Sequence, residues 1–416
     1  MKNETKTMGV VFLTTLIGWI GFSLPFPIFS HLFLNAENGL VSVHHAPETR
    51  TVLLGIALAL YPLGQIIGAP FLGRLSDRIG RKKVLVWSLM ATVIGSLILA
   101  FGVTSGSLAL VFAGRFLSGL SEGSLAIAQT IAADVSSAKT KARNFAWIGI
   151  AIDLGFIAGP IIGGVLGDRS LMSGFDIWLP FWIAVSLFAL NVLVVIRMLD
   201  GSVDARAKQP ASTENKRNVL RMLGSRDLVQ PFLLSFVAFW AIMMFLEYFA
   251  VYFVQVFETP PAELGIYAAL VSIPLIAAGL CVQHVVRLAG NRMTGILSFV
   301  LMGGGFIAFL NAGSLTGLIL PMIVICVGVN FGQTVTSVIV SDIAKTEEQG
   351  QAMGLYRAIT VAAGGSSALM GGALAGYSPD YPFMTAILAC FAGLFFLPKD
   401  KSPSAQAMKD NRQTEC

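Results

Sequence analysis

Four ionisable side chains lie inside long apolar runs of this sequence: Arg115, Glu122, Asp153 and Glu247. If such a run crosses a membrane as a helix, one charge at its centre costs at least about 2.5 kcal/mol, so the charged group has to face protein or water. A carboxylate in that setting can take up and release protons, and a nearby arginine favours its ionised form. We therefore expect proton chemistry from Glu122 and Glu247, with Asp153 ranked behind them.

The amino-acid composition indicates which kind of secondary structure positions these residues. Hydrophobic residues make up 55% of the 416-residue chain and charged residues 12%, which leaves too little polar surface for a water-soluble globule. The apolar residues form runs of about 20, the length of a helix that crosses a hydrocarbon core of about 30 Å. No alternation of the kind seen in barrel strands dominates. We expect membrane helices near residues 8–34, 52–72, 83–102, 107–132, 145–167, 179–199, 231–257, 263–287, 292–312, 315–340, 353–375 and 380–397.

The predicted helices fall into two sets of six, separated by a charged gap. The gap is too polar to enter lipid and reads as a cytoplasmic linker between two halves. The predicted organisation is an N-terminal six-helix half at 1–199, the linker at 200–230, a C-terminal six-helix half at 231–397 and a cytoplasmic tail at 398–416.

Basic residues predict the orientation, because Lys and Arg are enriched in cytoplasmic loops. With both termini in the cytoplasm, Arg50 and Arg169 are the only basic residues in the segments that would face the periplasm. The bias indicates a multi-pass inner-membrane protein whose first helix is not cleaved. The net charge of +5 then needs no nucleic-acid partner, since it lies where cytoplasmic loops face anionic lipid headgroups.

Histidine and cysteine are placed poorly for metal binding or disulfides. No C-x-x-C pair is present, and the histidines do not cluster at ligand spacing. The sequence also contains no Walker loop, no H-E-x-x-H helix and no G-x-S-x-G elbow, which argues against an enzyme. We expect no metal and no cofactor, and small apolar packing as the role of most cysteines; the residues concerned are His31, His44, His45, His284, Cys281, Cys326, Cys390 and Cys416.

The loop after the second predicted helix carries a specific motif. It reads Gly73-Arg-Leu-Ser-Asp-Arg-Ile-Gly-Arg-Lys-Lys-Val-Leu85. Positive-inside bias explains its basic residues but not its spaced glycines and acid. One glycine would permit close helix approach, the next a tight turn, and the acid could pair with arginine. The motif resembles the G-x-L-A-D-R-x-G-R-K-x-x-L loop of the major facilitator superfamily, with Ser76 in place of Ala.

The resemblance implies a fold and a role for this loop. In that superfamily two six-helix bundles, related by pseudo-twofold symmetry, rock around a central site, and the loop is a conformational latch. The latch residues expected here are Gly73, Asp77, Arg78, Gly80, Arg81 and Asp134. The corresponding loop of the second half is reduced to Arg287-Leu-Ala-Gly-Asn-Arg292 and lacks the acid.

A second motif lies in the fifth predicted helix. Its spacing is similar to the G-x-x-x-G-P-x-x-G-G motif of drug and proton antiporters in the superfamily, and that resemblance implies a segment between the halves that restricts leak. The alternative is simple close packing, because small residues four apart let helices approach. Proline adds a kink or a flexible point. The matching residues are Gly155, Gly159, Pro160, Gly163 and Gly164.

The fourth predicted helix resembles the superfamily's R-x-x-x-G pattern at Arg115 and Gly119. On a continuous helix Arg115, Ser118, Glu122 and Gln129 share one stripe, with the arginine and glutamate two turns apart. The functional interpretation is that Arg115 tunes a proton-carrying acid. The alternative is a structural charge cluster that orders the bundle.

Two polar and aromatic faces are candidates for a substrate cavity. Trp240, Met244, Glu247, Tyr248 and Gln255 recur at helical spacing in the seventh predicted helix. The tenth predicted helix adds Asn330, Gln333, Thr334 and Ser337. Packing stripes and interhelical hydrogen bonds are the alternatives. Such a cavity suits a lipophilic or amphiphilic solute through hydrophobic and cation–π contacts.

The resemblance and the intramembrane acids together lead to one expectation of function. We expect an all-α membrane protein of the major-facilitator fold, monomeric, that exchanges protons for a small-molecule substrate and exports drug-like compounds. The alternative is a proton-coupled carrier of one metabolite, such as an amino acid, a sugar or a siderophore. A channel is disfavoured because no repeated filter loop is present.

Overall fold

The computed structural model describes residues 2–35, 40–41, 46–137, 140–201, 225–344 and 348–398. Most of the expected linker at 200–230, nearly all of the expected tail at 398–416, and His44, His45 and Cys416 lie outside the described residues.

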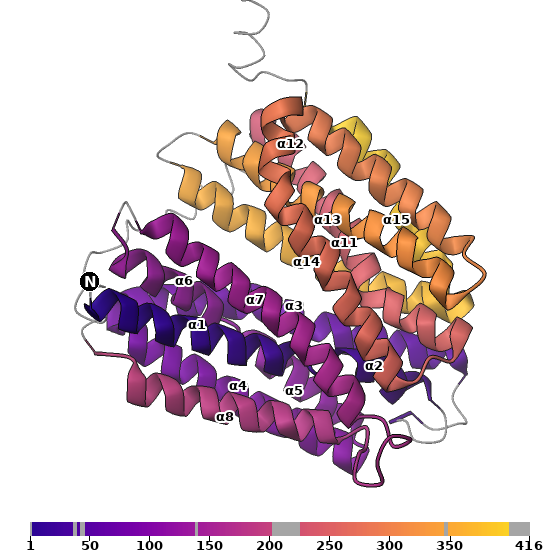
Figure 1. Cartoon of the computed structure of the whole chain (residues 1–416), viewed down its shortest axis with the longest axis horizontal. Coiled ribbons are helices and arrows are strands. Elements are labelled where there is room, and N and C mark those ends of the chain that lie inside the picture. The colour runs from indigo at the N-terminus through magenta and orange to yellow at the C-terminus, as the bar shows by residue number, and fades with distance from the viewer. Residues whose placement is uncertain are drawn as a thin grey trace, which may run out of the picture. The chain divides into compact units, whose positions relative to one another are not determined.

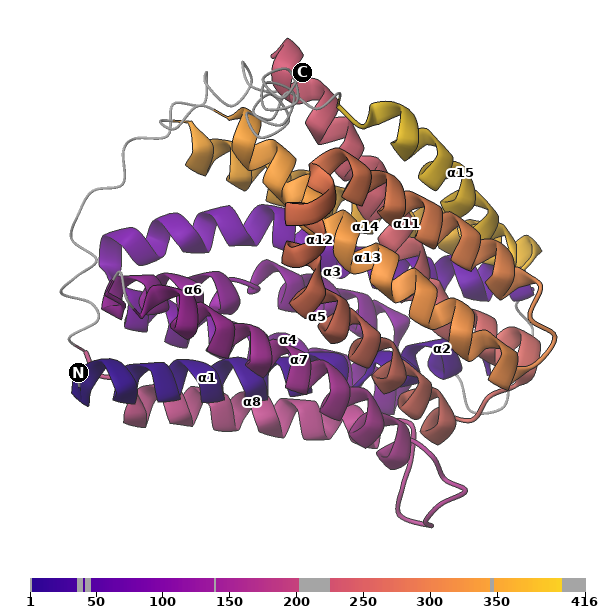
Figure 2. The same ribbon diagram turned by 45° about the horizontal axis from the view of Figure 1, so that its top comes forward.

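The described chain is built from helices (Figures 1 and 2). Their bounds are α1 Lys2–Ser23, α2 Phe26–Leu34, α3 Pro47–Ile79, α4 Arg81–Ser105, α5 Leu108–Leu120, α6 Ser124–Val135, α7 Lys141–Leu166, α8 Leu179–Met198, α11 Arg226–Phe257, α12 Pro261–Leu310, α13 Leu315–Ile343, α14 Gln349–Tyr377 and α15 Tyr381–Phe396. The expected all-α fold is confirmed.

Within the described ranges, nine helical stretches are long and apolar enough to cross a membrane. One of them, α12, is 50 residues long because its two parts meet at the non-helical Gly290. The predicted fourth span is divided into α5 and α6, and α15 is a shorter apolar helix. The nine stretches are fewer than the twelve predicted helices for these reasons, and each predicted helix overlaps an observed helix or helix pair.

Proline and glycine explain where the long helices break or turn. Pro25 and Pro27 separate α1 from α2, since a proline ring clashes with the preceding turn and supplies no N–H. Gly80 joins α3 to α4 with φ 114° and ψ 147°, and Gly290 has φ 78° and ψ 166°. Both conformations are ones that glycine adopts without strain.

The contacts divide the chain into two compact units. The first comprises Met1–Glu214, Met243–Ile273 and Val361–Phe383, so segments from the second half of the sequence pack with the first half. The second comprises Asn215–Ile242, Pro274–Thr360 and Met384–Cys416. In the first unit α1 lies beside α7 and α8 (Figures 1 and 2).

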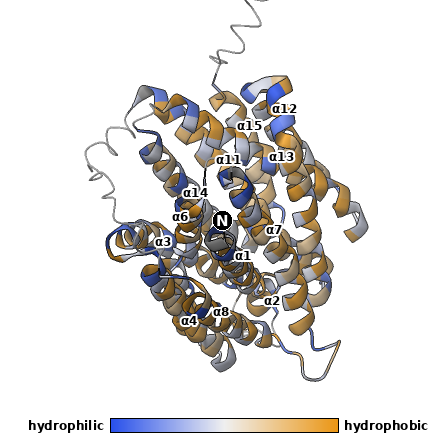
Figure 3. Ribbon diagram, turned by 60° about the vertical axis from the view of Figure 1, so that its left-hand side comes forward, coloured by the Kyte–Doolittle hydropathy of each residue, from blue (hydrophilic) through white to orange (hydrophobic). Residues whose placement is uncertain are grey.

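The outer faces of the helices carry large apolar side chains. Ile67, Phe71, Leu280, Leu388 and Phe395 each expose more than half of their surface. Most of the helical ribbon in Figure 3 has the colour of hydrophobic residues. A water-soluble protein rarely exposes so many large apolar side chains, whereas lipid is the solvent that such side chains require. The chain is a multi-pass membrane protein.

Candidate functional site

Arg115 is buried in the first unit and binds the part of α3 that precedes Pro62. Its side chain is 8% exposed; Nε donates to the carbonyl of Ala57 at 3.0 Å and Nη2 to that of Leu58 at 3.4 Å. Pro62 has no N–H to donate to the Leu58 carbonyl four residues earlier, so that oxygen lacks its helical partner. The guanidinium takes the place of the missing donor.

Two aromatic rings flank the same guanidinium. Its carbon lies 4.9 Å from the ring centroid of Phe29 and 5.0 Å from that of Tyr61. Both distances are within the range of cation–π attraction, which grows when the cation is removed from water. Arg115 is therefore fixed by α3 carbonyls and by aromatic faces from α2 and α3.

Glu122 lies in the turn between α5 and α6, not on a continuous helix. The expected stripe through Arg115, Glu122 and Gln129 is wrong, because Ser121–Gly123 interrupts the helix. Tyr61 nevertheless joins the two charges: its hydroxyl donates to Glu122 Oε2 at 2.5 Å while its ring faces Arg115. The sequence identified both charged residues and missed the tyrosine between them.

Glu247 on α11 approaches this group from the second half of the sequence. Its Oε2 accepts a hydrogen bond from Ser367 of α14 at 3.0 Å, and its charge interacts electrostatically with that of Arg115. The neighbouring Tyr248 is 1% exposed and donates to the backbone carbonyl of Ala368. Tyr61 thus bridges Arg115 and Glu122, while Glu247, which is held by Ser367, joins this group through its electrostatic interaction with Arg115.

Asp153 on α7 stands apart from that group. It is partly exposed and makes no hydrogen bond or ion pair within the described part of the chain. Helical spacing of seven and eleven residues places it on the same face of α7 as Pro160 and Gly164.

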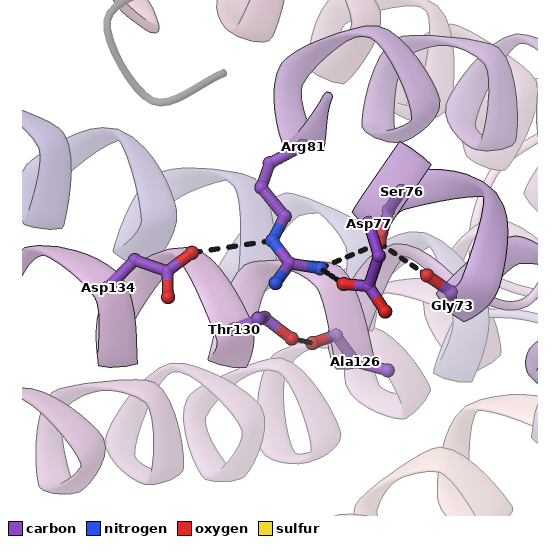
Figure 4. A network of polar contacts seen from close by, with 7 residues as sticks. All are labelled: Gly73, Ser76, Asp77, Arg81, Ala126, Thr130 and Asp134. Atoms are coloured by element: carbon purple, nitrogen blue, oxygen red, sulfur yellow. Dashed lines mark hydrogen bonds and ion pairs between the residues drawn. The ribbon is translucent and has the colours of Figure 1, made fainter. Parts of the chain in front are cut away.

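Two of the expected latch residues, Asp77 and Asp134, meet at Arg81, as Figure 4 shows. Arg81 forms an ion pair with Asp77, and its Nε lies 3.3 Å from Asp134 Oδ2. Its Nη1 also donates to Ser76 Oγ at 2.9 Å, and Ser76 Oγ donates to the carbonyl of Gly73 at 2.8 Å. Ser76, the departure from the superfamily pattern, is therefore part of the cluster.

Two latch residues behave differently from the expectation. A Cβ added to Gly73 would meet no atom within 4 Å, so the expected close helix approach is absent there in this structure. Arg78 is exposed and has no polar partner among the residues described. The corresponding loop of the second half has a similar turn but no ion pair at this position in the part of the chain that the structure describes. Gly290 has a positive φ, as Gly80 does, and the next residue, Asn291, donates from its neutral amide Nδ2 to Asp342 Oδ2 at 3.4 Å.

The glycine motif of the fifth predicted helix, called the span-five motif below, packs α7 against the end of α1 and the start of α12 within the first unit. Gly155, Gly159 and Gly163 face the stretch Trp19–Leu24, where a Cβ would collide with side-chain or backbone atoms. Ser23 Oγ also donates to the carbonyl of Gly155 at 2.9 Å. These contacts account for the spacing of the small residues on this face.

The other face of the motif touches the start of α12. A Cβ on Gly164 would collide with the carbonyl of Pro261 and lie 3.0 Å from Gly265 Cα. A second glycine pair, Gly55 and Gly372, brings α3 and α14 equally close. At this end of the first unit, the two halves of the sequence pack backbone to backbone.

The residues expected to line a cavity mostly make hydrogen bonds to backbone. Gln255 Nε2 lies 3.5 Å from the carbonyl of Ala375, and Asn330 Nδ2 donates to that of Leu275 at 3.1 Å. The backbone carbonyl of Gln333 accepts from Tyr356 at 3.3 Å. Trp240 on α11 is partly exposed.

A partly exposed aromatic cluster lies beside Glu122 instead. Its centroid distances are 5.2 Å for Trp19–Phe22, 5.0 Å for Phe22–Phe26, 4.8 Å for Trp19–Phe156 and 5.1 Å for Phe22–Tyr61. Trp19, Phe22 and Phe26 recur at three and four residues along the predicted first helix, which is the signal that could have revealed this face.

No group of three metal-ligating side chains occurs in the ranges that the structure describes. The described cysteines are free: Cys281 is exposed, and Cys326 and Cys390 are buried.

The sequence and the fold of this chain are similar to those of known membrane transporters. The chain is 29% identical over 381 residues to the class B tetracycline resistance protein of Escherichia coli, covering 88% of this chain and 86% of that protein. It is 23% identical over 421 residues to multidrug resistance protein 2 of Bacillus subtilis, covering 98% of each. The structure of the nucleoside transporter NupG matches with a TM-score of 0.75 at 16% identity, over 95% of this chain and 100% of that one. The Major Facilitator Superfamily model matches residues 11–338 and 232–413, and the chain belongs to this superfamily of membrane transporters.

Proposed function

We propose that the protein is a proton-coupled exporter of small lipophilic or amphiphilic compounds, working by alternating access in the inner membrane. The two termini are cytoplasmic in this proposal, the 200–230 segment is a cytoplasmic linker, and the working unit is a monomer. The names of the relatives, which concern tetracycline and multidrug resistance, support export of drug-like compounds.

The observation that carries the proposal is the polar group formed by Arg115, Tyr61, Glu122, Glu247 and Ser367. Acids inside membrane helices are costly and are retained where they serve function. A proton that enters down a membrane potential supplies about 2.3 kcal/mol per 100 mV, which can drive a solute outward. Glu122 and Glu247 are the coupling candidates, and Asp153 is the third.

The aromatic cluster supplies a surface for the substrate. Trp19, Phe22, Phe26 and Phe156 offer ring faces beside the Tyr61–Glu122 hydrogen bond. Flat apolar molecules stack on such faces, and a cationic centre gains cation–π attraction. Trp240, Tyr248, Gln255, Asn330 and Gln333 remain second candidates, since hydrogen bonds such as those of Tyr248 and Asn330 to backbone carbonyls serve packing.

Conformational change is assigned to the latch and to the span-five motif. In this proposal the Asp77–Arg81–Asp134 cluster stabilises one state of the transport cycle, and the Gly164–Gly265 and Gly55–Gly372 contacts close one end of the substrate path. Asp77→Asn should reduce the transport rate in protein that still reaches the membrane. An unchanged rate would remove the latch from the mechanism.

The second candidate function is proton-coupled transport of one metabolite. The polar group and the fold serve that function equally well, and the structural neighbour transports nucleosides. The aromatic cluster favours the exporter, because it offers few directional hydrogen bonds with which to select one polar solute.

Uptake into inverted membrane vesicles with an inside-acid gradient separates the two functions. An exporter should accumulate tetracycline or lipophilic fluorescent dyes, and a protonophore should abolish the accumulation. Gradient-driven uptake of one sugar, amino acid or siderophore without any dye uptake would favour the metabolite carrier. Uptake of neither kind would contradict both.

A further inference from the structure

His31 connects α2 to the turn between α11 and α12 inside the first unit. The side chain is 7% exposed, with Nδ1 lying 3.0 Å from the carbonyl oxygen of Pro27 and Nε2 lying 2.8 Å from that of Thr259. Both ring nitrogens therefore face backbone oxygens that can only accept hydrogen bonds. A neutral imidazole carries one N–H, so it can satisfy one of these contacts and must oppose a lone pair to the other. Imidazolium carries two N–H groups and satisfies both.

We propose that His31 is a proton-binding site, separate from the intramembrane acids, whose protonated ring holds α2 against the α11–α12 turn. The proton binds to whichever ring nitrogen lacks one, and no other bond changes. This inference goes beyond the proposed function, because it concerns the packing of α2 against the α11–α12 turn whether or not any substrate is transported.

The turn that receives the ring is well fixed. Thr259 is 1% exposed, and both its N–H and its hydroxyl donate to the carbonyl of Phe253, at 3.3 and 3.1 Å. Glu258 reverses the chain with a left-handed φ of 52°. The Thr259 carbonyl therefore points in a defined direction. Loss of its hydrogen bond with His31 leaves a buried acceptor unsatisfied, which costs free energy.

Burial of the ring disfavours its charged form, and the buried acid Asp168 acts in the opposite direction. Asp168 is 6% exposed, interacts electrostatically with His31, and accepts hydrogen bonds from Ser170 and from the backbone N–H of Ala262 at the start of α12. His31 and Asp168 thus contact successive parts of the same turn. Other charged groups near the ends of these elements are Glu48 and Arg50 of α3, Arg169 and Asp176 of the loop that holds Asp168, Glu258 of the turn and Glu263 of α12.

The consequence is a link between proton occupancy and closure. His31 and Asp168 belong to the first half of the sequence, and Thr259 and Ala262 belong to the second. A ligand shifts a two-state equilibrium toward the state that binds it more tightly. Protonation of His31 should therefore favour the packed state of this end, and deprotonation should favour its opening.

Spin-label distances measured in detergent, without substrate or gradient, test this directly. Labels are placed at Met172→Cys and Glu263→Cys in a protein whose four native cysteines are alanine. The ratio of short to long distances should fall about tenfold or more as the pH rises from about 5 to about 8, the range in which histidine changes charge. His31→Gln should give a ratio independent of pH, because one neutral amide cannot replace the imidazolium. His284→Gln, which alters an exposed histidine, should behave like the parent protein.

Nitrogen NMR of 15N-histidine in the unlabelled native protein keeps the inference testable if His31→Gln folds poorly. The resonances assigned to His31 should show both nitrogens protonated at the pH where the short distance dominates. A neutral ring at that pH, or a pH dependence in His31→Gln equal to that of the parent, would overturn the proposal. Loss of drug transport alone would bear on the proposed function and not on this site.

Discussion

Arg115 shows how one side chain serves structure and charge together. Its two hydrogen bonds go to α3 carbonyls, one of which lost its helical donor to Pro62. The same guanidinium interacts with Glu247 and lies over the Tyr61 ring. Replacing it should therefore affect folding stability as well as any coupling, and the two effects have to be separated.

A double-mutant cycle separates the structural part. Arg115→Ala removes the donor to the Leu58 carbonyl, whereas Pro62→Ala restores a backbone N–H that can bond to it. Arg115→Ala should cost about 1 kcal/mol less in the Pro62→Ala background than in the native one. Thermal unfolding of the four proteins in detergent measures this difference. Equal costs in both backgrounds would show that Arg115 does not compensate for Pro62.

Ser367 offers a test of how Glu247 is positioned. Ser367→Ala removes the hydroxyl that lies 3.0 Å from Glu247 Oε2, and a hydrogen bond to a charged group contributes roughly 1.5–3 kcal/mol. Proton-driven uptake should fall about tenfold or more. Ser366→Ala is the matched control, because that hydroxyl bonds to Ala363 in its own helix. Equal uptake in the two variants would remove Ser367 from the site.

At the scale of elements, the close packing of α7 could be predicted from its sequence, whereas the break between α5 and α6 could not. The small residues of α7 have a spacing that packing explains, and they do meet α1 and α12. Ser121–Gly123 is a Ser-Glu-Gly stretch whose polar residues and glycine favour a helix poorly, but the length of the apolar run around it predicted one continuous helix. Tertiary contacts hold that break: Ser88 donates to the Ser121 carbonyl at 2.6 Å, and Tyr61 bonds to Glu122.

Two glycines on α7 give opposite expectations for the same substitution. Gly164→Ala places a methyl group against the α12 backbone and should cost about 1–3 kcal/mol through overpacking, with reduced transport. Gly149→Ala meets open space and should stabilise the helix by about 0.5–1 kcal/mol with transport unchanged. Unfolding midpoints and vesicle uptake report both. Identical behaviour of the two variants would refute the packing account.

The α3–α4 corner depends on the conformation of Gly80. Gly80→Ala forces a side chain into φ 114° and should destabilise the protein by roughly 1–3 kcal/mol. Gly304→Ala is the control, since Gly304 lies inside α12 with open space around it. Thermal unfolding in detergent compares them. No loss of stability at Gly80 would mean that the corner adopts another conformation.

At the scale of the whole molecule, hydropathy and helix length predicted the membrane helices, because lipid imposes both on any spanning segment. The charged residues of the site could also be identified, since each violates that rule. Their partners could not: Tyr61 and Ser367 are unremarkable in sequence and acquire meaning only when α3 meets the α5–α6 turn and α14 meets α11. His31 was likewise assigned no role from sequence.

The central claim is that drug export is exchanged for protons at Glu122 or Glu247. Inverted vesicles holding an interior pH dye test it most directly, with the native protein compared with Glu122→Gln, Glu247→Gln and Asp153→Asn. Adding a transported compound outside acid-loaded vesicles should raise the interior pH in the native protein, and neutralising one of the first two acids should abolish that exchange. Substrate uptake with no proton movement, or exchange intact in all three variants, would contradict the account.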